Sequence, residues 1–246
     1  CWTHEADSMI ITNDQGNVDR PNNYILTRES GFKTITELTK GQNCNGADTH
    51  PINGELYFNS YNAGQVFRYD FNTKETIPLF TIQDSGWEFH IQFHPSGDYA
   101  YIVVVNKHYI LRSDYDWKTK RLTTPYIICG SQGDAAWVDG VGKKARMNRP
   151  RQGTFVKNPA YEGSNDEYDF YFCDRENHCI RILTPQGRVT TFAGRGSNGT
   201  SGYNDGDLRQ EARFNHPEGI VYDEERECFF IGDRENRRIR KIGYEE

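Results

Sequence analysis

The chain of 246 residues has no uninterrupted apolar run of about 18 residues, which is the length that a membrane-spanning helix needs. No segment shows a sustained 3.6-residue hydrophobic period either, and this excludes helical bundles and α/β folds. Short apolar runs separated by Gly, Pro, Asn and Asp occur instead along the whole chain. The sequence therefore predicts an all-β protein without a transmembrane helix.

Cysteine is sparse, and the six residues lack the close spacing of a metal site. Cys173 and Cys179 fall on the two arms of one expected hairpin, where they could form a disulfide or remain two buried thiols. The seven histidines also show no convergent set of the three or four ligands that zinc requires. His50-Pro51 and His94-Pro95 occupy the same turn of successive units, which favours a structural role for both histidines.

Catalytic motifs and excess positive charge are lacking as well. The sequence contains no Gly-x-Ser-x-Gly nucleophile motif, and no separated Ser/His/Asp pattern supports an enzyme. With 29 basic and 35 acidic residues the net charge is −6, which disfavours nucleic acid as a partner. These observations favour a protein that binds rather than one that catalyses.

What the chain does contain is a repeat. Residues 172–182 and 231–241 match position for position, sharing Asp-Arg-Glu-Asn and Ile-Arg. Each copy reads as an antiparallel hairpin around a polar Asp-x-x-Asn turn, because Asp and Asn bond nearby backbone N–H groups. Asp174 with Asn177, and Asp233 with Asn236, are accordingly predicted to cap turns rather than to catalyse. Arg181 and Arg240 recur too, and we expect them to pair with acidic groups of adjacent units.

Weaker copies extend the repeat toward the start of the chain. Four-stranded units of roughly 40 to 50 residues, rich in Tyr and Phe, are typical of β-propeller blades. We therefore predict one β-propeller domain over residues 1–246, with four-stranded blades in a ring of five or six, and a first blade that begins part-way. The expected units cover residues 1–40, 41–83, 84–130, 145–194 and 212–246.

The pattern Pro-x-Gly-Ile-x-x-Asp, an apolar run, then Asp-x-x-Asn-x-x-Ile-Arg-x-Ile resembles the NHL repeat. The match is tight from Ala145 to Ile242 and loose from Gly46 to Cys129. The spacers before the two closest copies are similar to linkers of propellers that follow an IPT/TIG domain on Bacteroidota surface lipoproteins. This resemblance implies an extracytoplasmic location at the outer-membrane surface and a role in nutrient acquisition. Cys1 would match an acylated terminus, but no flexible tether precedes the first expected strand, so a trimmed chain is the better explanation.

Candidate ligand-binding residues lie in the segments between units. Trp137 and Tyr203 hold equivalent positions, each two residues before an Asp-Gly pair, and an exposed aromatic face suits stacking on a sugar ring. The same two residues could instead pack between neighbouring blades. The predicted ligand-binding set is Trp87, His90, Trp137, Asp139, Tyr203 and Asp205.

The sequence thus predicts a non-catalytic binding or scaffolding module whose partner is a glycan or a neighbouring protein of a surface complex. One alternative is a calcium-dependent propeller hydrolase or lyase with a metal in its channel, and another is a purely structural interaction protein. No cofactor is predicted, and calcium is the one ion that the alternatives leave open. Its candidate ligands would be Asn45, Asp48, Glu88 and Glu218. Asn198-Gly199-Thr200 also matches an N-glycosylation acceptor.

Overall fold

A computed structural model describes residues 1–3, 5–13, 21–40, 43–60, 63–82, 88–194 and 200–243. Trp87 and Asn198 lie outside these ranges. Within them the fold is all-β, as predicted. These ranges contain no helix that could span a lipid bilayer. The only helical elements described there are single 3-10 turns: η1 (Val105–Lys107), η2 (Gly142–Lys144), η3 (Pro159–Tyr161) and η4 (Arg175–Asn177).

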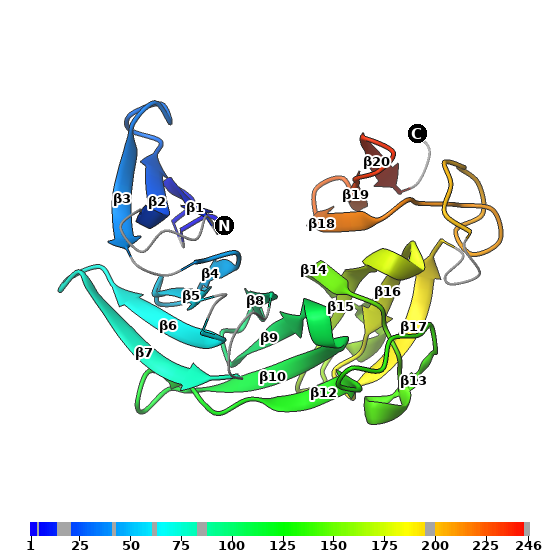
Figure 1. Cartoon of the computed structure of the whole chain (residues 1–246), viewed down its shortest axis with the longest axis horizontal. Coiled ribbons are helices and arrows are strands. Elements are labelled where there is room, and N and C mark those ends of the chain that lie inside the picture. Colours follow the sequence, from blue (N-terminus) through cyan, green and yellow to red (C-terminus); the bar gives the residue numbers. More distant parts are fainter. Residues whose placement is uncertain are drawn as a thin grey trace. The chain divides into compact units, whose positions relative to one another are not determined.

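Five antiparallel sheets of three to five strands follow one another along the chain, which confirms the predicted β-propeller fold class (Figure 1). The first sheet contains β1 (Ser8–Thr12), β2 (Pro21–Thr27) and β3 (Ile35–Lys40), and the second contains β4 (Ala47–Thr49), β5 (Leu56–Ser60), β6 (Gln65–Asp70) and β7 (Glu75–Thr81). The third contains β8 (Phe89–Phe93), β9 (Tyr99–Val104), β10 (Tyr109–Asp116), β11 (Arg121–Leu122) and β12 (Tyr126–Gly130).

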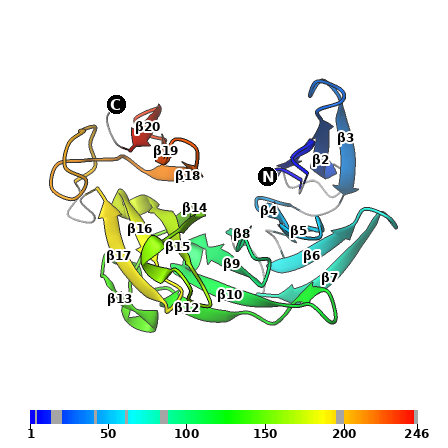
Figure 2. The same cartoon turned by 180° about the vertical axis from the view of Figure 1, so that it is seen from behind.

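The last two sheets carry the closely matching repeats. The fourth contains β13 (Gly140–Val141), β14 (Pro150–Lys157), β15 (Tyr168–Asp174), β16 (Cys179–Leu183) and β17 (Arg188–Ala193), in the order β13-β17-β16-β15-β14. The fifth contains only β18 (Pro217–Asp223), β19 (Cys228–Asp233) and β20 (Arg238–Ile242). Among the described residues, nothing in the fifth sheet corresponds to β17, and β20 is therefore an edge strand (Figures 1 and 2).

The chain divides into two compact units. Unit 1 comprises Cys1–Ile102 and Leu111–Tyr126, and unit 2 comprises Val103–Ile110 and Ile127–Glu246. Both repeat hairpins and both spacer segments belong to unit 2. Four of the six predicted ligand-binding residues therefore lie in one compact body.

The turns of unit 1 are held by buried histidines, as the His-Pro pattern predicted. His50 is buried, and its Nδ1 accepts hydrogen bonds from the backbone N–H groups of Ile52 and Asn53 at 3.2 and 3.3 Å. His94 is likewise buried and stacks on Tyr99, with ring centroids 4.5 Å apart. Both side chains therefore stabilise turns.

The repeat hairpin of the fourth sheet runs from β15 through η4 to β16. Asp174 pairs with Cys179, and Cys173 pairs with Ile180, so the two cysteines stand diagonally rather than opposite each other. Both are buried thiols, and burial raises the pKa of each well above its ordinary value. The hairpin is consequently closed by packing and hydrogen bonds, without a disulfide.

The fourth and fifth sheets pack face to face through one hydrophobic cluster in unit 2. Cys173 and Ile180 of the fourth sheet share this cluster with Ile220, Phe229 and Ile231 of the fifth. Full burial of each large apolar side chain contributes roughly 1.5–3 kcal/mol. Stacking of the two sheets therefore forms this core, because each sheet covers an apolar face of the other.

The outer strands of the third and fourth sheets, β12 and β17, both end at a glycine. Gly130 and Gly194 have φ of +89° and +83°. Glycine adopts such positive φ values far more readily than other residues, because it has no Cβ. A Cβ on Gly194 would lie 2.8 Å from the carbonyl oxygen of His178, and one on Gly130 would lie 2.6 Å from that of His108. Glycine is required at both positions by close backbone approach as well as by φ.

Candidate functional site

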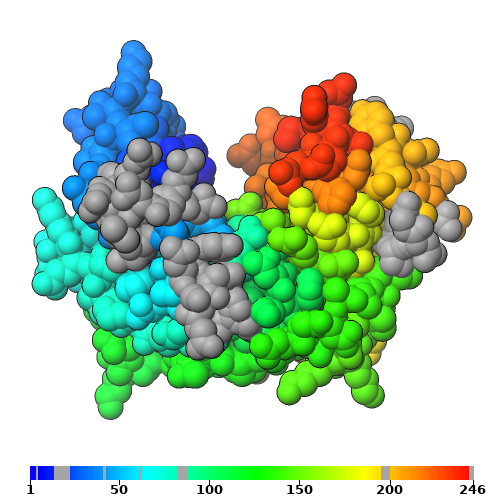
Figure 3. Space-filling model, in the orientation of Figure 1, coloured from blue at the N-terminus to red at the C-terminus, as the bar shows by residue number. Residues whose placement is uncertain are grey.

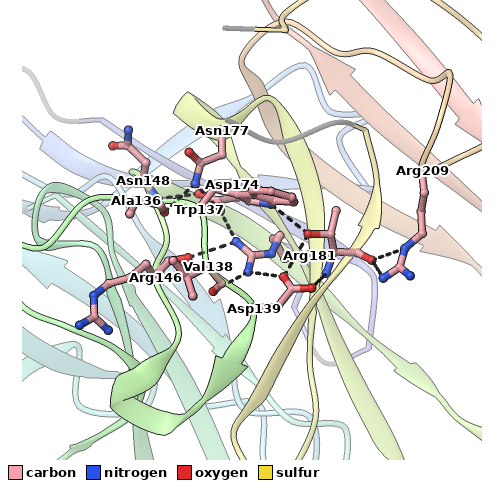
Figure 4. Close-up of polar contacts among 11 residues, drawn as sticks. Ala136, Trp137, Val138, Asp139, Arg146, Asn148, Asp174, Asn177, Arg181 and Arg209 are labelled. Carbon is pink, nitrogen blue, oxygen red and sulfur yellow. Dashed lines mark hydrogen bonds and ion pairs between the residues drawn. The ribbon is translucent and has the colours of Figure 1, made fainter. Parts of the chain in front are cut away.

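The first candidate site is built around Arg181, a fully buried arginine on β16 (Figure 4). Its guanidinium donates to Asp174 at 2.7 Å and to Asp139 at 2.8 Å. It also donates to the backbone carbonyls of Val138 and Arg146 at 3.1 and 3.2 Å. Arg181 therefore fastens the spacer segment 137–146 to its own sheet, and we call these contacts the Arg181 cluster.

Asp174 does not cap its turn with its side chain as predicted, and its contacts reach outside that turn. One oxygen accepts from the backbone N–H of Asn148 at 2.7 Å, and the other accepts from Asn177 and Arg181. The η4 turn itself receives no side-chain cap from Asp174. Burial raises the pKa of Asp174, and the charge of Arg181 opposes that rise. The aspartate is thus the centre of a buried ion pair.

Trp137 and Asp139 are both tied to Thr191 of β17, the outer strand of the same sheet. The indole N–H of Trp137 donates to the Thr191 hydroxyl at 3.0 Å, and that hydroxyl donates to Asp139 at 3.1 Å. The backbone N–H of Thr191 also donates to Asp139 at 3.3 Å. Trp137 still exposes 38% of its surface, so its orientation is fixed while part of its ring faces solvent.

The second candidate site repeats this arrangement around Arg240 on β20. The guanidinium donates to Asp233 at 3.0 Å, to Asp205, and to the carbonyls of Asn204 and Arg213 at 2.9 and 3.0 Å. We call this the Arg240 cluster. In both clusters the acidic partners come from the arginine's own hairpin and its spacer segment. The prediction that these arginines pair with adjacent units was therefore wrong.

Tyr203 takes the place of Trp137 in the Arg240 cluster. The guanidinium carbon of Arg240 lies 4.6 Å from the centroid of the Tyr203 ring, a cation–π distance. Tyr203 is 57% exposed, and the side chain of Asp205 is 84% exposed, against 43% for Asp139. The second cluster is therefore the more open of the two.

A groove of about 1500 Å³ adjoins the Arg240 cluster in unit 2. Tyr203 and Asp205 contribute to its wall, together with the edge strand β20 and aromatic side chains of the two stacked sheets. Figure 3 shows the atoms of this last sheet, coloured orange to red, at the surface of the molecule. The groove therefore lies where the fourth sheet, the fifth sheet and the spacer segment around Tyr203 meet.

Two predicted residues remain, Trp87 and His90. Trp87 lies outside the described residues. His90 is half-buried on β8 and belongs to unit 1. The structure thus brings Trp137 together with Asp139, and Tyr203 together with Asp205.

Sequence reasoning missed a further polar cluster in unit 2. Arg175 and Arg234 hold the same position in the two repeat hairpins, and both reach one oxygen of Glu218, at 2.9 and 3.1 Å. Arg151 approaches the same oxygen at 3.8 Å, and burial together with the nearby Arg175 and Arg234 lowers its pKa. The repeated Asp-Arg-Glu-Asn sequence is the feature from which this cluster could have been predicted, because it places two arginines on neighbouring sheets.

Three of the four candidate calcium ligands have described contacts, and each bonds to other groups of the protein. Asp48 accepts hydrogen bonds from the backbone N–H groups of Thr49 and Phe93, and burial raises its pKa to about 6. Asn45 accepts from Asn59, and Glu218 accepts from arginines. Across the described ranges, no group of three or more His, Cys, Asp or Glu side chains converges as a metal site would require.

Three solved structures match this chain closely. An auxiliary nutrient binding protein from Bacteroides thetaiotaomicron is 92% identical, with a TM-score of 0.97. A second auxiliary nutrient binding protein, from Bacteroides ovatus, is 45% identical with a TM-score of 0.95. A further Bacteroides thetaiotaomicron protein, provisionally named a phosphatase, is 42% identical with a TM-score of 0.92. No family model and no curated protein matches the chain.

Each of these likenesses covers 100% of this chain. The chain in turn spans only 58%, 58% and 60% of the three solved chains. The relatives therefore carry substantial polypeptide beyond the matched region.

Proposed function

We propose that this chain is a non-catalytic binding module of a nutrient-acquisition apparatus at a bacterial cell surface, and that its ligand is a glycan. The observation that carries the nutrient-binding role is the 92% identity, over the whole chain, to an auxiliary nutrient binding protein. The second Bacteroides protein of that description supports the same role at 45% identity. Glycan as the ligand class rests on the geometry of Trp137 and Tyr203.

Both aromatic rings are held in place while remaining partly exposed. Trp137 is fixed through its indole N–H on Thr191, and Tyr203 lies against the guanidinium of Arg240. A fixed aromatic face loses little side-chain entropy when a ligand stacks on it. Sugar rings present C–H groups to such faces, and nearby polar side chains can bond their hydroxyl groups. The two clusters therefore suit a carbohydrate better than a wholly apolar ligand.

The location and partners that we propose for the module are suggested by the NHL resemblance and agree with the Bacteroides origin of the similar structures. In this proposal the propeller stands outside the cytoplasm, at the outer-membrane surface, as part of a lipid-anchored protein. A neighbouring protein of the same surface complex would then present or receive the glycan. Fractionation of Bacteroides cells with an antibody to this chain tests the location, and recovery from the cytosol alone would contradict it.

Substitution of the aromatic residues tests the ligand-binding proposal. Trp137→Ala and Tyr203→Ala should each weaken binding of the cognate glycan about tenfold, equivalent to roughly 1.4 kcal/mol, with little change in the unfolding midpoint. Trp117→Ala is the matched control, because Trp117 is also exposed and also has a bonded indole N–H, but lies outside the spacer segments. A large fall in the unfolding midpoint of the two spacer variants, without selective loss of binding, would favour a purely structural role.

The phosphatase name of one similar structure makes an enzyme the second candidate. We measure hydrolysis of para-nitrophenyl phosphate, with calcium, with magnesium and with EDTA. The proposal predicts no turnover above the rate of the heat-denatured chain. Metal-dependent turnover would contradict this proposal and would favour a hydrolase instead.

A further inference from the structure

Three arginines of unit 2 surround one carboxylate oxygen of Glu218, and we call these four residues the Glu218 cluster. Arg175 and Arg234 lie 2.9 and 3.1 Å from that oxygen, and Arg151 lies 3.8 Å from it. Arg151 belongs to β14 and Glu218 to β18, two strands that lie side by side (Figures 1 and 2). The other two arginines come from the turns of the repeat hairpins. Four separate elements therefore direct charged groups to one point.

Within the cluster positive charge exceeds negative charge, and two of its three cations are sheltered from water. The side chains of Arg151 and Arg175 each expose 13% of their surface. Glu218 exposes 34% and Arg234 exposes 52%, so these two form the side that faces solvent. Burial and the two neighbouring guanidinium groups lower the pKa of Arg151, and the carboxylate of Glu218 opposes that shift. An anion that enters from the solvent side therefore meets a field of positive charge.

Two further carboxylates border the cluster. Glu176 accepts from Arg175 at 2.6 Å, and its other oxygen lies 3.2 Å from a ring nitrogen of His216. Glu235 lies 3.7 Å from Arg234, and half of its side chain is exposed. Each of these carboxylates has its described ion pair with one arginine of the cluster. Glu218 is therefore the carboxylate on which the three arginines converge.

A hollow of about 350 Å³ adjoins the solvent side of the cluster. Glu218 and Arg234 line it, and Arg237 and Arg238 add two further cations to its wall. This volume lies at the lower end of the range of about 300–1,000 Å³ that is typical of ligand pockets. The hollow therefore suits a single sugar residue with a negative charge.

The two hairpin turns connect the Glu218 cluster with the partly exposed aromatic residues. In the fourth sheet, Asn177 donates to the carbonyl of Ala136, the residue before Trp137, at 3.0 Å. In the fifth sheet, Asn236 bonds the residue before Tyr203 in the same way, at 2.8 Å. Each turn therefore carries one arginine of the cluster and fixes the backbone beside one aromatic ring.

We propose that the arginines of the Glu218 cluster bind the carboxylate of a uronic acid residue in an acidic glycan, which takes the place of the Glu218 carboxylate. This inference rests on the proposed glycan-binding function and narrows its ligand class. Guanidinium groups match the geometry of a carboxylate, and such charge-assisted hydrogen bonds are roughly twice as strong as neutral ones. Glu218 occupies the position of the ligand's carboxylate, and it turns into solvent when the ligand binds.

The charges around the cluster favour a carboxylate over a sulfate ester. The whole chain has a net charge of −6, and Glu176 and Glu235 border the site. These negative charges repel a densely sulfated polymer more strongly than a polymer with one carboxylate on each sugar residue. The ligand that we propose is therefore a polyuronate.

Affinity gel electrophoresis with matched pairs of polysaccharides tests the ligand class. Polygalacturonate, alginate and hyaluronan are each paired with their carboxyl-reduced forms, which are neutral, and EDTA is present throughout. We expect at least one of the three to bind the chain at least about tenfold more tightly than its reduced form, because only the charged form makes charge-assisted hydrogen bonds. Added NaCl should weaken that binding, since it screens the exposed side of the cluster.

The outcomes separate this inference from the proposed function. Equal binding of a polyuronate and its reduced form, or binding of neutral glycans alone, would overturn the inference and leave the glycan-binding function intact. If no polysaccharide binds, charged or neutral, both are contradicted. Binding of dextran sulfate without binding of any polyuronate would also overturn the inference, because the site would then prefer sulfate esters.

Arg234→Gln tests the site itself. This variant should weaken binding of the polyuronate about tenfold and leave the unfolding midpoint nearly unchanged, because half of the Arg234 side chain is exposed. Arg188→Gln is the matched control: Arg188 is an exposed arginine of the same unit outside the cluster, and its replacement removes the same charge. Equal weakening in the two variants would show that net charge, and not the Glu218 cluster, binds the polymer.

Glu218→Gln separates a ligand site from a structural ion pair. The variant should bind the polyuronate at least about threefold more tightly, because the competing carboxylate of the protein is removed. Binding of the carboxyl-reduced form should not change. A structural role alone would lower the unfolding midpoint without any gain in affinity. Unchanged or weaker binding of the polyuronate by this variant would therefore contradict displacement of Glu218.

Discussion

At the scale of single residues, the two spacer segments depend on one buried arginine each. Arg181 and Arg240 recur in the sequence, and their recurrence alone predicted a structural role. The identity of their partners could not be predicted, because Asp139 and Asp174 are 35 residues apart in sequence and meet only through the fold. Likewise, Trp137 and Tyr203 could be found as equivalent aromatic residues, whereas the indole bond to Thr191 required the structure.

Replacing Arg181 with Met should destabilise the chain by about 3–5 kcal/mol, because Asp174 would remain buried without its cation. The double variant Arg181→Met with Asp174→Asn should recover part of that loss, since it removes the buried carboxylate charge. Urea unfolding of the wild type and both variants measures the free energies. A single variant as stable as the wild type would show that Arg181 does not hold the spacer segment.

His178 should make the stability of the chain depend on pH. Burial, with the nearby charge of His216, lowers the pKa of His178 below 6.5, and its Nδ1 accepts the backbone N–H of His216 at 3.2 Å. The neutral form is therefore favoured in the folded state, and stability should be fully present above about pH 6.5 and fall as the pH drops below it.

His178→Asn is the test of this dependence. Asn tolerates the φ of 56° at this position and keeps an acceptor close to the backbone of His216, without a titrating group. Thermal unfolding midpoints between pH 5 and 8 should fall less steeply toward acid in the variant. If the unfolding midpoint of the variant falls toward acid pH as steeply as that of the wild type, groups other than His178 cause the pH dependence of stability.

At the scale of elements, the hairpins were the most predictable part of the protein. The Asp-x-x-Asn turn, the flanking apolar runs and the register of β15 with β16 all follow from local sequence. The outer strands were less predictable, because β17 is fixed by contacts with the spacer segment as well as by its own pattern. The arginines that share Glu218 also depend on the stacking of two sheets, which no local pattern shows.

Gly194→Ala should destabilise the fourth sheet by about 2–4 kcal/mol, because the new Cβ would meet the carbonyl oxygen of His178 in addition to the strain of a positive φ. Gly163→Ala is the matched control: its φ of +79° is similar, but no atom lies within 4 Å of the added Cβ. It should lose only about 1 kcal/mol. Equal losses in the free energy of unfolding would mean that close packing at Gly194 is unimportant.

At the scale of the whole molecule, repetition made the fold predictable, and its β-propeller class is confirmed. Each unit reuses the same turns and stacked faces, so two well-matched copies were enough to indicate the architecture. The ligand was not predictable in the same way, because fold class does not fix function. Trp87 remains a prediction outside the described residues, and the ligand-binding roles of His90, Trp137, Asp139, Tyr203 and Asp205 remain proposals.

We propose that this chain binds a glycan without transforming it. Affinity gel electrophoresis of the folded chain against a panel of plant and host polysaccharides, with and without EDTA, measures this directly. We predict that one class of polysaccharide retards the chain, equally in both conditions, while the polysaccharide keeps its length on size-exclusion chromatography. Unchanged migration of the chain with every polysaccharide, or shortening of the polysaccharide that binds, would contradict this proposal.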